Sequence, residues 1–272
     1  MSLGFGKFDR PEPWAVATGG GGVWARPDGL QGATMPNPVL YMPVITTVLS
    51  IAFSAALLRR YLAKGRGPHL LVWAIGVLVY GVGTFTEAFT SVFGWHEGIF
   101  RAWYISGALL GGAPLAQGTA YLLLRRKTAH VLTACLVTVV LTASACVLAS
   151  PVNGALAEPH RLSGKVLAWP WVRAFSPFIN TYALIFLVGG AILSAVRFSR
   201  RKETHHRFVG NVLIAIGALL PGIGGTFTRF GYVEVLYVTE LIGLSLIYAG
   251  YRFNIGIPLP VVVEPMAQRS VG

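Results

Sequence analysis

Long apolar stretches, separated by charged or turn-forming residues, dominate the hydropathy pattern of this chain. Seven of them approach the length of about 20 residues that a helix needs to cross a hydrocarbon core of about 30 Å. They do not alternate between apolar and polar residues as membrane β-strands do, and a backbone in lipid must satisfy its own hydrogen bonds. We therefore predict an all-α membrane protein with seven transmembrane helices, at residues 40–58, 70–93, 103–124, 131–149, 182–198, 209–226 and 235–251.

The composition agrees with this pattern. Of the 272 residues, 54% are hydrophobic and only 12% are charged, whereas an ordinary soluble domain carries about 25% charged residues. The composition therefore excludes a soluble globular protein and indicates an integral membrane protein.

Lysines and arginines are distributed unevenly between the two sets of loops that alternate along the chain. One side of the predicted membrane, which includes the C-terminal segment, carries 14 of these basic residues and two acidic ones. The other side, which includes the N-terminal segment, carries eight basic and eight acidic residues. Cytoplasmic loops carry the excess of basic residues. We therefore predict a multi-pass protein of the plasma (inner) membrane, with the N-terminus outside and the C-terminus cytoplasmic. The net charge of +12 then reflects topology and attraction to anionic lipid, and we expect no nucleic-acid partner.

Three regions follow from these boundaries. Residues 1–38 are rich in Gly and Pro and are predicted to form a flexible extracytoplasmic tail. Residues 39–253 form the seven-helix domain, and residues 254–272 form a short cytoplasmic tail.

An internal repeat is visible when the chain is aligned with itself at an offset of 141 residues. The letters AIGVLVYGVGTFTEAF, from position 74, then lie over AIGALLPGIGGTFTRF, from position 215, with Gly225 as one inserted residue in the second copy. We predict two parallel three-helix units around a linker helix, with repeat A at about 39–124, the linker at about 129–149 and repeat B at about 180–253. This layout is similar to that of SWEET sugar transporters and rhodopsins. However, the Pro-Gln signature and a lysine in the seventh span are both missing, so no motif assigns the chain to either family.

Ionisable residues inside a membrane are costly and are functional candidates by default. Glu240 lies deepest, while Glu87, Arg101 and Arg229 lie in the outer half of their spans, and the repeat places Glu87 opposite Arg229. These groups either form structural ion pairs or, with nearby polar side chains, line an outward-facing polar pocket. The uncharged polar side chains near these groups could equally serve only to form hydrogen bonds between helices. The ligand-binding or coupling candidates are Glu240, Glu87, Arg229, Arg101, Gln117, Tyr104, Thr84 and Thr226.

Two functions agree with these features. The first is a small-molecule or ion transporter, or a ligand-binding seven-helix protein, with the polar pocket as its site. The second is a non-catalytic membrane subunit, receptor-like or scaffold module that acts through protein partners. No catalytic motif, metal-ligand spacing or facing histidine pair is present, so we expect neither an enzyme nor a metal or other cofactor. Expected partners are membrane lipids and a small-molecule ligand or a partner membrane subunit.

Overall fold

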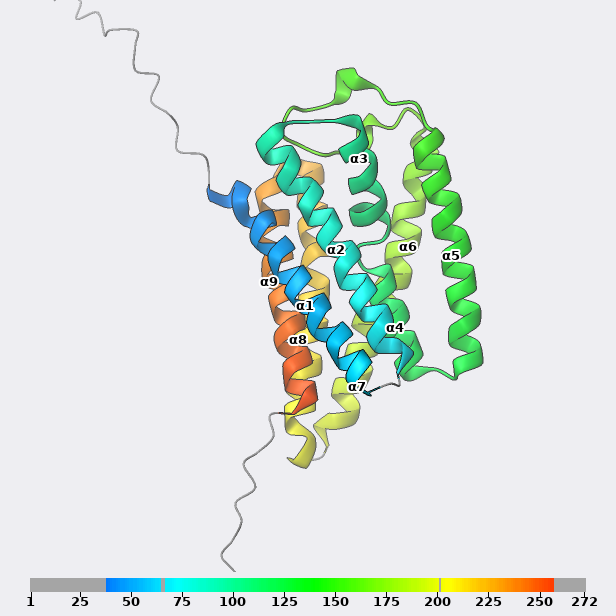
Figure 1. The fold of residues 1–272 in the computed structure, drawn as a ribbon, viewed down its shortest axis with the longest axis vertical. Coiled ribbons are helices and arrows are strands. Elements are labelled where there is room, and N and C mark those ends of the chain that lie inside the picture. Colours follow the sequence, from blue (N-terminus) through cyan, green and yellow to red (C-terminus); the bar gives the residue numbers. More distant parts are fainter. Residues whose placement is uncertain (1–37, 65–66, 201, 257–272) are drawn as a thin grey trace, which may run out of the picture. The chain divides into compact units, whose positions relative to one another are not determined.

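Long helices that run side by side between two ends of a bundle make up the fold (Figure 1). The computed structural model describes residues 38–64, 67–200 and 202–256, all within one unit of the chain, and this part forms helices and contains no strand. The main elements are α1 (Met42–Lys64), α2 (Pro68–Phe93), α3 (Glu97–Trp103), η2 (Tyr104–Leu109), α4 (Ala113–Leu123), α5 (Arg126–Ala149), α6 (Phe175–Ala183), η6 (Leu184–Gly189), α7 (Gly190–Ser199), α8 (His205–Phe227) and α9 (Val233–Ile255). Short 3-10 turns are η1 (Pro38–Tyr41), η3 (Gly154–Leu156), η4 (Gly164–Val166), η5 (Pro170–Ala174), η7 (Lys202–Thr204) and η8 (Thr228–Phe230). The predicted all-helical class is confirmed.

Six helical segments are long and apolar enough to cross a bilayer, as in a multi-pass membrane protein. They are Met42–Ala63, Pro68–Phe93, Arg126–Ala149, Pro170–Ser199, His205–Phe227 and Val233–Ile255. Each overlaps a predicted span. The fourth of them begins 12 residues before the predicted start at residue 182, because η5, α6, the π-helix η6 and α7 follow one another without a break. Seven passes, the membrane orientation and the repeat remain predictions.

The third predicted span is not one continuous helix. It consists of α3, the π-helical turn η2, a break at residues 110–112 and then α4 (Figure 1). Gly111 and Gly112 favour the break because glycine loses more backbone freedom in a helix than other residues do. Pro114 starts the next helix because its fixed φ suits a first turn, in which its missing N–H is not needed. The prediction of a single helix over residues 103–124 is therefore wrong.

Glycines allow α8 and α9 to pack backbone against backbone. A Cβ added at Gly217 would lie 2.5 Å from the carbonyl oxygen of Gly243, and one added at Gly243 would lie 2.6 Å from that of Gly217. Two turns along, Gly210 and Gly250 repeat this reciprocal contact. The spacing of seven residues on both helices keeps these glycines on one face of each helix. Small residues of this kind are a common means of helix association in membranes.

A similar contact joins α2 to the interrupted segment. A Cβ at Gly83 would lie 3.1 Å from the Cα of Gly107, and one at Gly76 would lie 2.9 Å from the backbone nitrogen of Leu115. The two segments are antiparallel, so one turn beyond the first contact Glu87 meets Trp103. The glycines thus determine which side chains of α2 and the third segment face each other.

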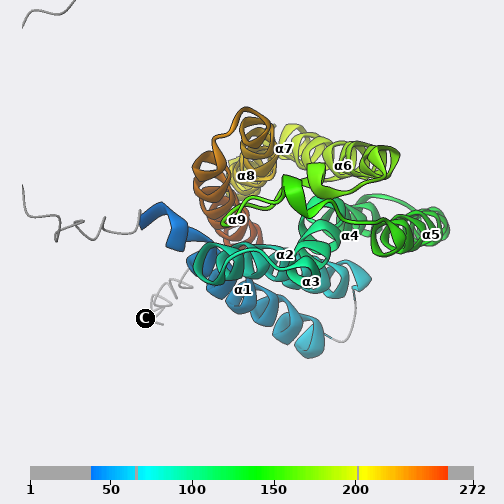
Figure 2. The same cartoon turned by 90° about the horizontal axis from the view of Figure 1, so that it is seen from above.

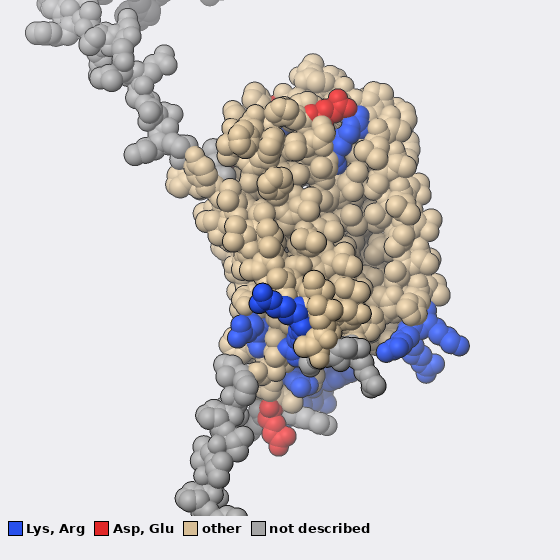
Figure 3. Space-filling view, in the orientation of Figure 1, with Lys and Arg blue, Asp and Glu red and all other residues tan. Residues whose placement is uncertain are grey.

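Lysine and arginine side chains gather at one end of the described bundle (Figure 3). This end, called the basic end below, contains the last turns of α1, α7 and α9 and the first turns of α2, α5 and α8. Viewed along the bundle, α5 lies at its edge (Figure 2). The predicted tail at residues 1–38, except Pro38, and residues 257–272 of the predicted C-terminal tail lie outside the described residues.

Candidate functional site

Two carboxyl groups meet in the interior of the helical bundle. Glu87 on α2 and Glu240 on α9 expose only 5% and 9% of their surfaces, and their carboxyl groups are within hydrogen-bonding reach of each other. Because an ionised carboxylate can only accept hydrogen bonds, a hydrogen bond between these two groups would require a proton on one of them. We call these two residues the carboxyl pair.

The third segment and two tyrosines surround the carboxyl pair. The indole Nε1 of Trp103 donates a hydrogen bond to Glu87 Oε1 over 2.8 Å. The hydroxyl of Tyr80 donates to the backbone oxygen of Glu240 over 3.5 Å, and the hydroxyl of Tyr237 pairs with that of Ser91 over 3.5 Å. The second carboxyl oxygen, Oε2, of each glutamate is buried and receives no hydrogen bond from a described donor.

No described arginine or lysine neutralises the carboxyl pair. The ion pairs within residues 38–64, 67–200 and 202–256 join Glu97 to Arg101 and Glu158 to Arg161. Neither of them involves a member of the carboxyl pair. The backbone of Arg229 lies in η8, but its side chain lies outside the described part of the structure. Pairing of Glu87 with Arg229 therefore remains a prediction.

The hydroxyls of the two candidate threonines bond elsewhere than to the carboxyl pair. Thr84 is buried on the face of α2 that meets α1, where its hydroxyl lies 2.9 Å from that of Thr47. Thr226 is exposed, and its hydroxyl donates to the carbonyl of Gly222 on its own helix over 3.0 Å. Although the repeat aligns these threonines, their surroundings differ.

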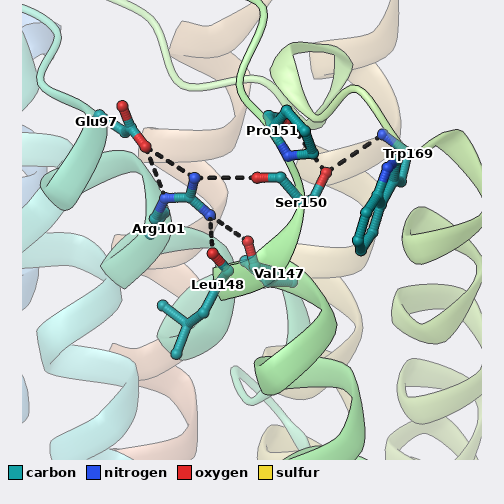
Figure 4. Close-up of polar contacts among 7 residues, drawn as sticks. All are labelled: Glu97, Arg101, Val147, Leu148, Ser150, Pro151 and Trp169. Atoms are coloured by element: carbon teal, nitrogen blue, oxygen red, sulfur yellow. Dashed lines mark hydrogen bonds and ion pairs between the residues drawn. The ribbon is translucent and has the colours of Figure 1, made fainter.

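Arg101 binds the end of α5 instead of the carboxyl pair (Figure 4). Its guanidinium donates to the carbonyl oxygens of Leu148 and Ser150 over 2.9 and 3.0 Å, and also to that of Val147. The same guanidinium forms an ion pair with Glu97, with 2.7 Å between Nη2 and Oε1. Carbonyl groups in the last turn of a helix have no partner within it, so this geometry makes Arg101 a cap for α5.

Gln117 and Tyr104 also lie away from the carboxyl pair. The side-chain nitrogen of Gln117 donates to the backbone oxygen of Ala129 over 3.0 Å and to the hydroxyl of Thr133 over 2.7 Å, which joins α4 to α5. The hydroxyl of Tyr182 on α6 donates to the side-chain oxygen of Gln117. Tyr104 is 3% exposed, and its ring packs near that of Trp103.

We expect Tyr182→Phe to destabilise the contact between α4 and α6 by about 1 kcal/mol, because the variant removes one donor and leaves the buried Gln117 oxygen without it. Thermal unfolding of protein in neutral lipid nanodiscs measures this change. Thr181→Val on the same helix is the control, because the exposed Thr181 hydroxyl bonds only to the carbonyl of Pro177 on its own helix. An equal loss in both variants would contradict a special role for the Gln117 bond.

The structure contains a cavity that sequence analysis did not find. It has a volume of about 580 Å³ and lies at the basic end, lined by residues of α1, α2, α4, η6, α7, α8 and α9. The outward-facing pocket was expected at the opposite end of the helices. Three arginines of the lining, Arg60, Arg197 and Arg207, were interpreted only as topology signals. Their positions at helix ends were visible in the sequence, but their convergence on one cavity depends on how the helices pack.

Neither metal ligation nor a relationship to known proteins adds to this description. Within the described residues, no three His, Cys, Asp or Glu side chains gather closely enough to hold a metal ion. Comparison with protein-family profiles, curated proteins and solved structures finds no match for this chain. The function is therefore inferred from the geometry of the carboxyl pair and of the cavity.

Proposed function

We propose that this protein is a plasma-membrane transporter of a small molecule or ion, and that its carboxyl pair takes up and releases a proton during transport. The single observation that carries the proposal is the contact between Glu87 and Glu240, two buried carboxyl groups on different helices with no described cation between them. Intramembrane carboxyl groups that face the interior of a bundle are characteristic of proton relays in pumps and transporters.

Electrostatics link the protonation of this pair to helix movement. With one proton the two groups share a hydrogen bond, whereas without it two negative charges stand side by side in a medium of low dielectric constant, where their repulsion is strong. Release of the proton therefore favours a conformation in which α2 and α9 separate at this point or in which a cation enters. A group that is charged in one conformation and neutral in another couples proton binding to the conformational equilibrium.

The layer between the carboxyl pair and the cavity supports the same proposal. Val77 on α2 is completely buried, and Leu244 on α9 is 2% exposed. Leu244 lies one turn from Glu240, on the side of the cavity-lining Ile247. A transporter needs such a closed layer, because its central site must open to one side of the membrane at a time.

Glu240→Gln tests the proposed role of the pair. We expect wild-type protein adsorbed in proteoliposomes on a solid-supported membrane to give a transient charge displacement after a pH jump. Glu240→Gln and Glu87→Gln should each abolish this charge displacement, because an amide side chain does not take up or release a proton during the pH jump. Glu234→Gln is the matched control, since Glu234 lies exposed in the first turn of the same helix. Retention of the full signal in Glu240→Gln, with the fold intact, would refute the proposal.

The side chain of Arg229 requires a separate experiment. If it pairs with Glu87, then Glu87→Arg and Arg229→Glu should each impair the charge displacement, and the double exchange should restore it. No rescue by the double exchange would show that the two side chains are not paired.

A second candidate function is a subunit or receptor-like module that acts through protein partners. The observation in its favour is the low burial of α5. Only 11% of its apolar span is buried inside the bundle, the lowest share of the six spans, so most of this helix is open to a partner or to lipid. Native mass spectrometry of gently extracted protein distinguishes the two candidates. A stoichiometric co-purified membrane subunit would favour this second function, whereas lipid bound to a chain without partners would argue against it.

A further inference from the structure

The cavity at the basic end combines two kinds of surface. Its mouth carries guanidinium groups from three helices, Arg60 on α1, Arg197 on α7 and Arg207 on α8. Its deeper wall is apolar and includes Trp73 on α2 and Leu115 on α4. From Arg197 back to Leu187, the lining residue of η6, the helix descends by about 15 Å at 1.5 Å per residue. The cavity thus extends from the rim of the bundle to about the middle of a bilayer core.

Two of the three guanidinium groups at the mouth lie over aromatic rings, and none of the three has a described carboxylate partner. That of Arg60 lies over the ring of Tyr251, with 5.8 Å to the ring centre, and that of Arg207 lies over the ring of Phe198 at 5.5 Å. A guanidinium that stacks on a ring keeps N–H donors at its edge. Because no described Asp or Glu pairs with these arginines, the mouth presents positive charge and donors that suit a carboxylate or a phosphate.

The interior disfavours a ligand that is polar throughout. Two polar residues of the wall are joined by a hydrogen bond, which the side-chain nitrogen of Asn211 donates to the side-chain oxygen of Asn254 over 3.2 Å, and their amides also donate to the carbonyls of Arg207 and Gly250. A polar ligand that entered beyond the arginines would lose hydration and gain few partners from this mostly apolar wall, which costs free energy. An apolar chain would instead cover the exposed wall of Trp73 and its neighbours. The volume of about 580 Å³ is within the usual range of ligand sites.

We propose that this cavity binds an anionic amphiphile, with its carboxylate or phosphate headgroup at Arg60, Arg197 and Arg207 and its apolar chain against Trp73 and Leu115. The ligand is either a lipid of the surrounding leaflet or a single-chain amphiphile that enters from the adjoining aqueous phase. This site is separate from the carboxyl pair, and the proposal holds whether or not the protein transports its ligand.

Trp73 provides a local signal for the experiment. Among the described tryptophans, it alone lies at the basic end, whereas Trp95, Trp103, Trp169 and Trp171 lie toward the opposite end. We would titrate protein in phosphatidylcholine nanodiscs with a long-chain fatty acid brominated in its chain, because bromine quenches tryptophan at short range. We expect saturable quenching that disappears in Trp73→Phe. A brominated alkyl trimethylammonium of the same chain length should give only the linear quenching that comes from partition into the bilayer.

Arginine variants identify the headgroup site. We expect Arg197→Gln combined with Arg207→Gln to weaken saturable binding by at least about tenfold, the effect of losing one strong charge-assisted hydrogen bond. The matched control is Arg125→Gln combined with Arg126→Gln, which removes the same charge from the same end of the bundle at positions outside the cavity. Equal weakening in both double variants would overturn the proposal, because it would assign the effect to surface charge alone.

Competition on the wild-type protein keeps the test independent of how the variants fold. Unlabelled dodecyl phosphate should displace the brominated fatty acid, and dodecyltrimethylammonium should not. Displacement by phosphatidic acid as well would identify a bilayer lipid as the source of the headgroup, and displacement by dodecyl phosphate alone would identify a single-chain ligand. Equal displacement by the anionic and cationic amphiphiles would refute recognition of an anion.

Discussion

Gly217→Ala is expected to destabilise the folded protein by about 3 kcal/mol, although the substitution adds a single carbon. The added Cβ would lie 2.5 Å from the carbonyl oxygen of Gly243 and 3.0 Å from the backbone nitrogen of Ile247. Both atoms belong to the backbone of α9, so a change of rotamer cannot relieve the clash and the two helices must move apart. Their separation also disrupts the contact between Gly210 and Gly250, and core overpacking of this kind costs about 1–3 kcal/mol or more.

The same substitution elsewhere on α8 should have the opposite sign. A Cβ at Gly222 meets no atom within 4 Å, so Gly222→Ala is expected to stabilise the helix by about 0.5–1 kcal/mol through the lower backbone entropy of the unfolded chain. Thermal unfolding in neutral nanodiscs compares the two variants directly. Similar stability in both would contradict the close approach of α8 and α9.

A double variant adds a stricter test of the reciprocal contact. Gly217→Ala and Gly243→Ala each force the same two helices apart, so one separation accommodates both added carbons. We therefore expect the combined loss of stability to be clearly smaller than the sum of the single losses, as is usual for residues in direct contact. Additive losses would indicate two independent clashes.

Features of this fold that depend on many consecutive residues could be predicted from the sequence, whereas a feature that depends on a few residues could not. Long apolar stretches predict the six bilayer-length helices because hydropathy over about 20 residues reflects a single physical requirement, the thickness of the bilayer. The interruption of the third segment depends on Gly111, Gly112 and Pro114, which a hydropathy window averages away. These residues were visible in the sequence, but Gly and Pro also occur inside continuous membrane helices, so their presence alone did not predict a break.

The candidate site was predicted less well, for a related reason. The depth of Glu87 and Glu240 follows from their positions within apolar stretches, and both are buried. Their mutual contact depends on which faces of α2 and α9 meet, and no pattern within either helix determines that. The repeat instead directed attention from Glu87 to Arg229 and from Thr84 to Thr226, because aligned positions share a place in the sequence without sharing neighbours in the fold.

Arg101 shows how a charged residue next to a predicted span can have a structural role. We expect Arg101→Ala to destabilise the protein by about 3 kcal/mol or more, because the variant removes bonds to three carbonyl groups at the end of α5. Each hydrogen bond to a charged group contributes about 1.5–3 kcal/mol, and the positive charge also suits the negative end of the helix dipole. Since these contributions are not additive, the expected total is below their sum.

Two variants separate capping of α5 from the ion pair. Glu97→Gln should cost only about 0.5 kcal/mol, because the Glu97 side chain is 55% exposed and surface ion pairs are weak. Arg101→Lys should fall between the two, because a lysine keeps the charge but cannot present the planar fork of donors that reaches several carbonyls. Unfolding temperatures in neutral nanodiscs rank the three variants.

Hydrogen exchange should accelerate selectively in the last turn of α5 for Arg101→Ala, since the loss of this cap frays that turn first. Equal destabilisation by Arg101→Ala and Glu97→Gln would instead make the ion pair the main contribution of this arginine, and Arg101 would then remain a candidate for binding an external ligand.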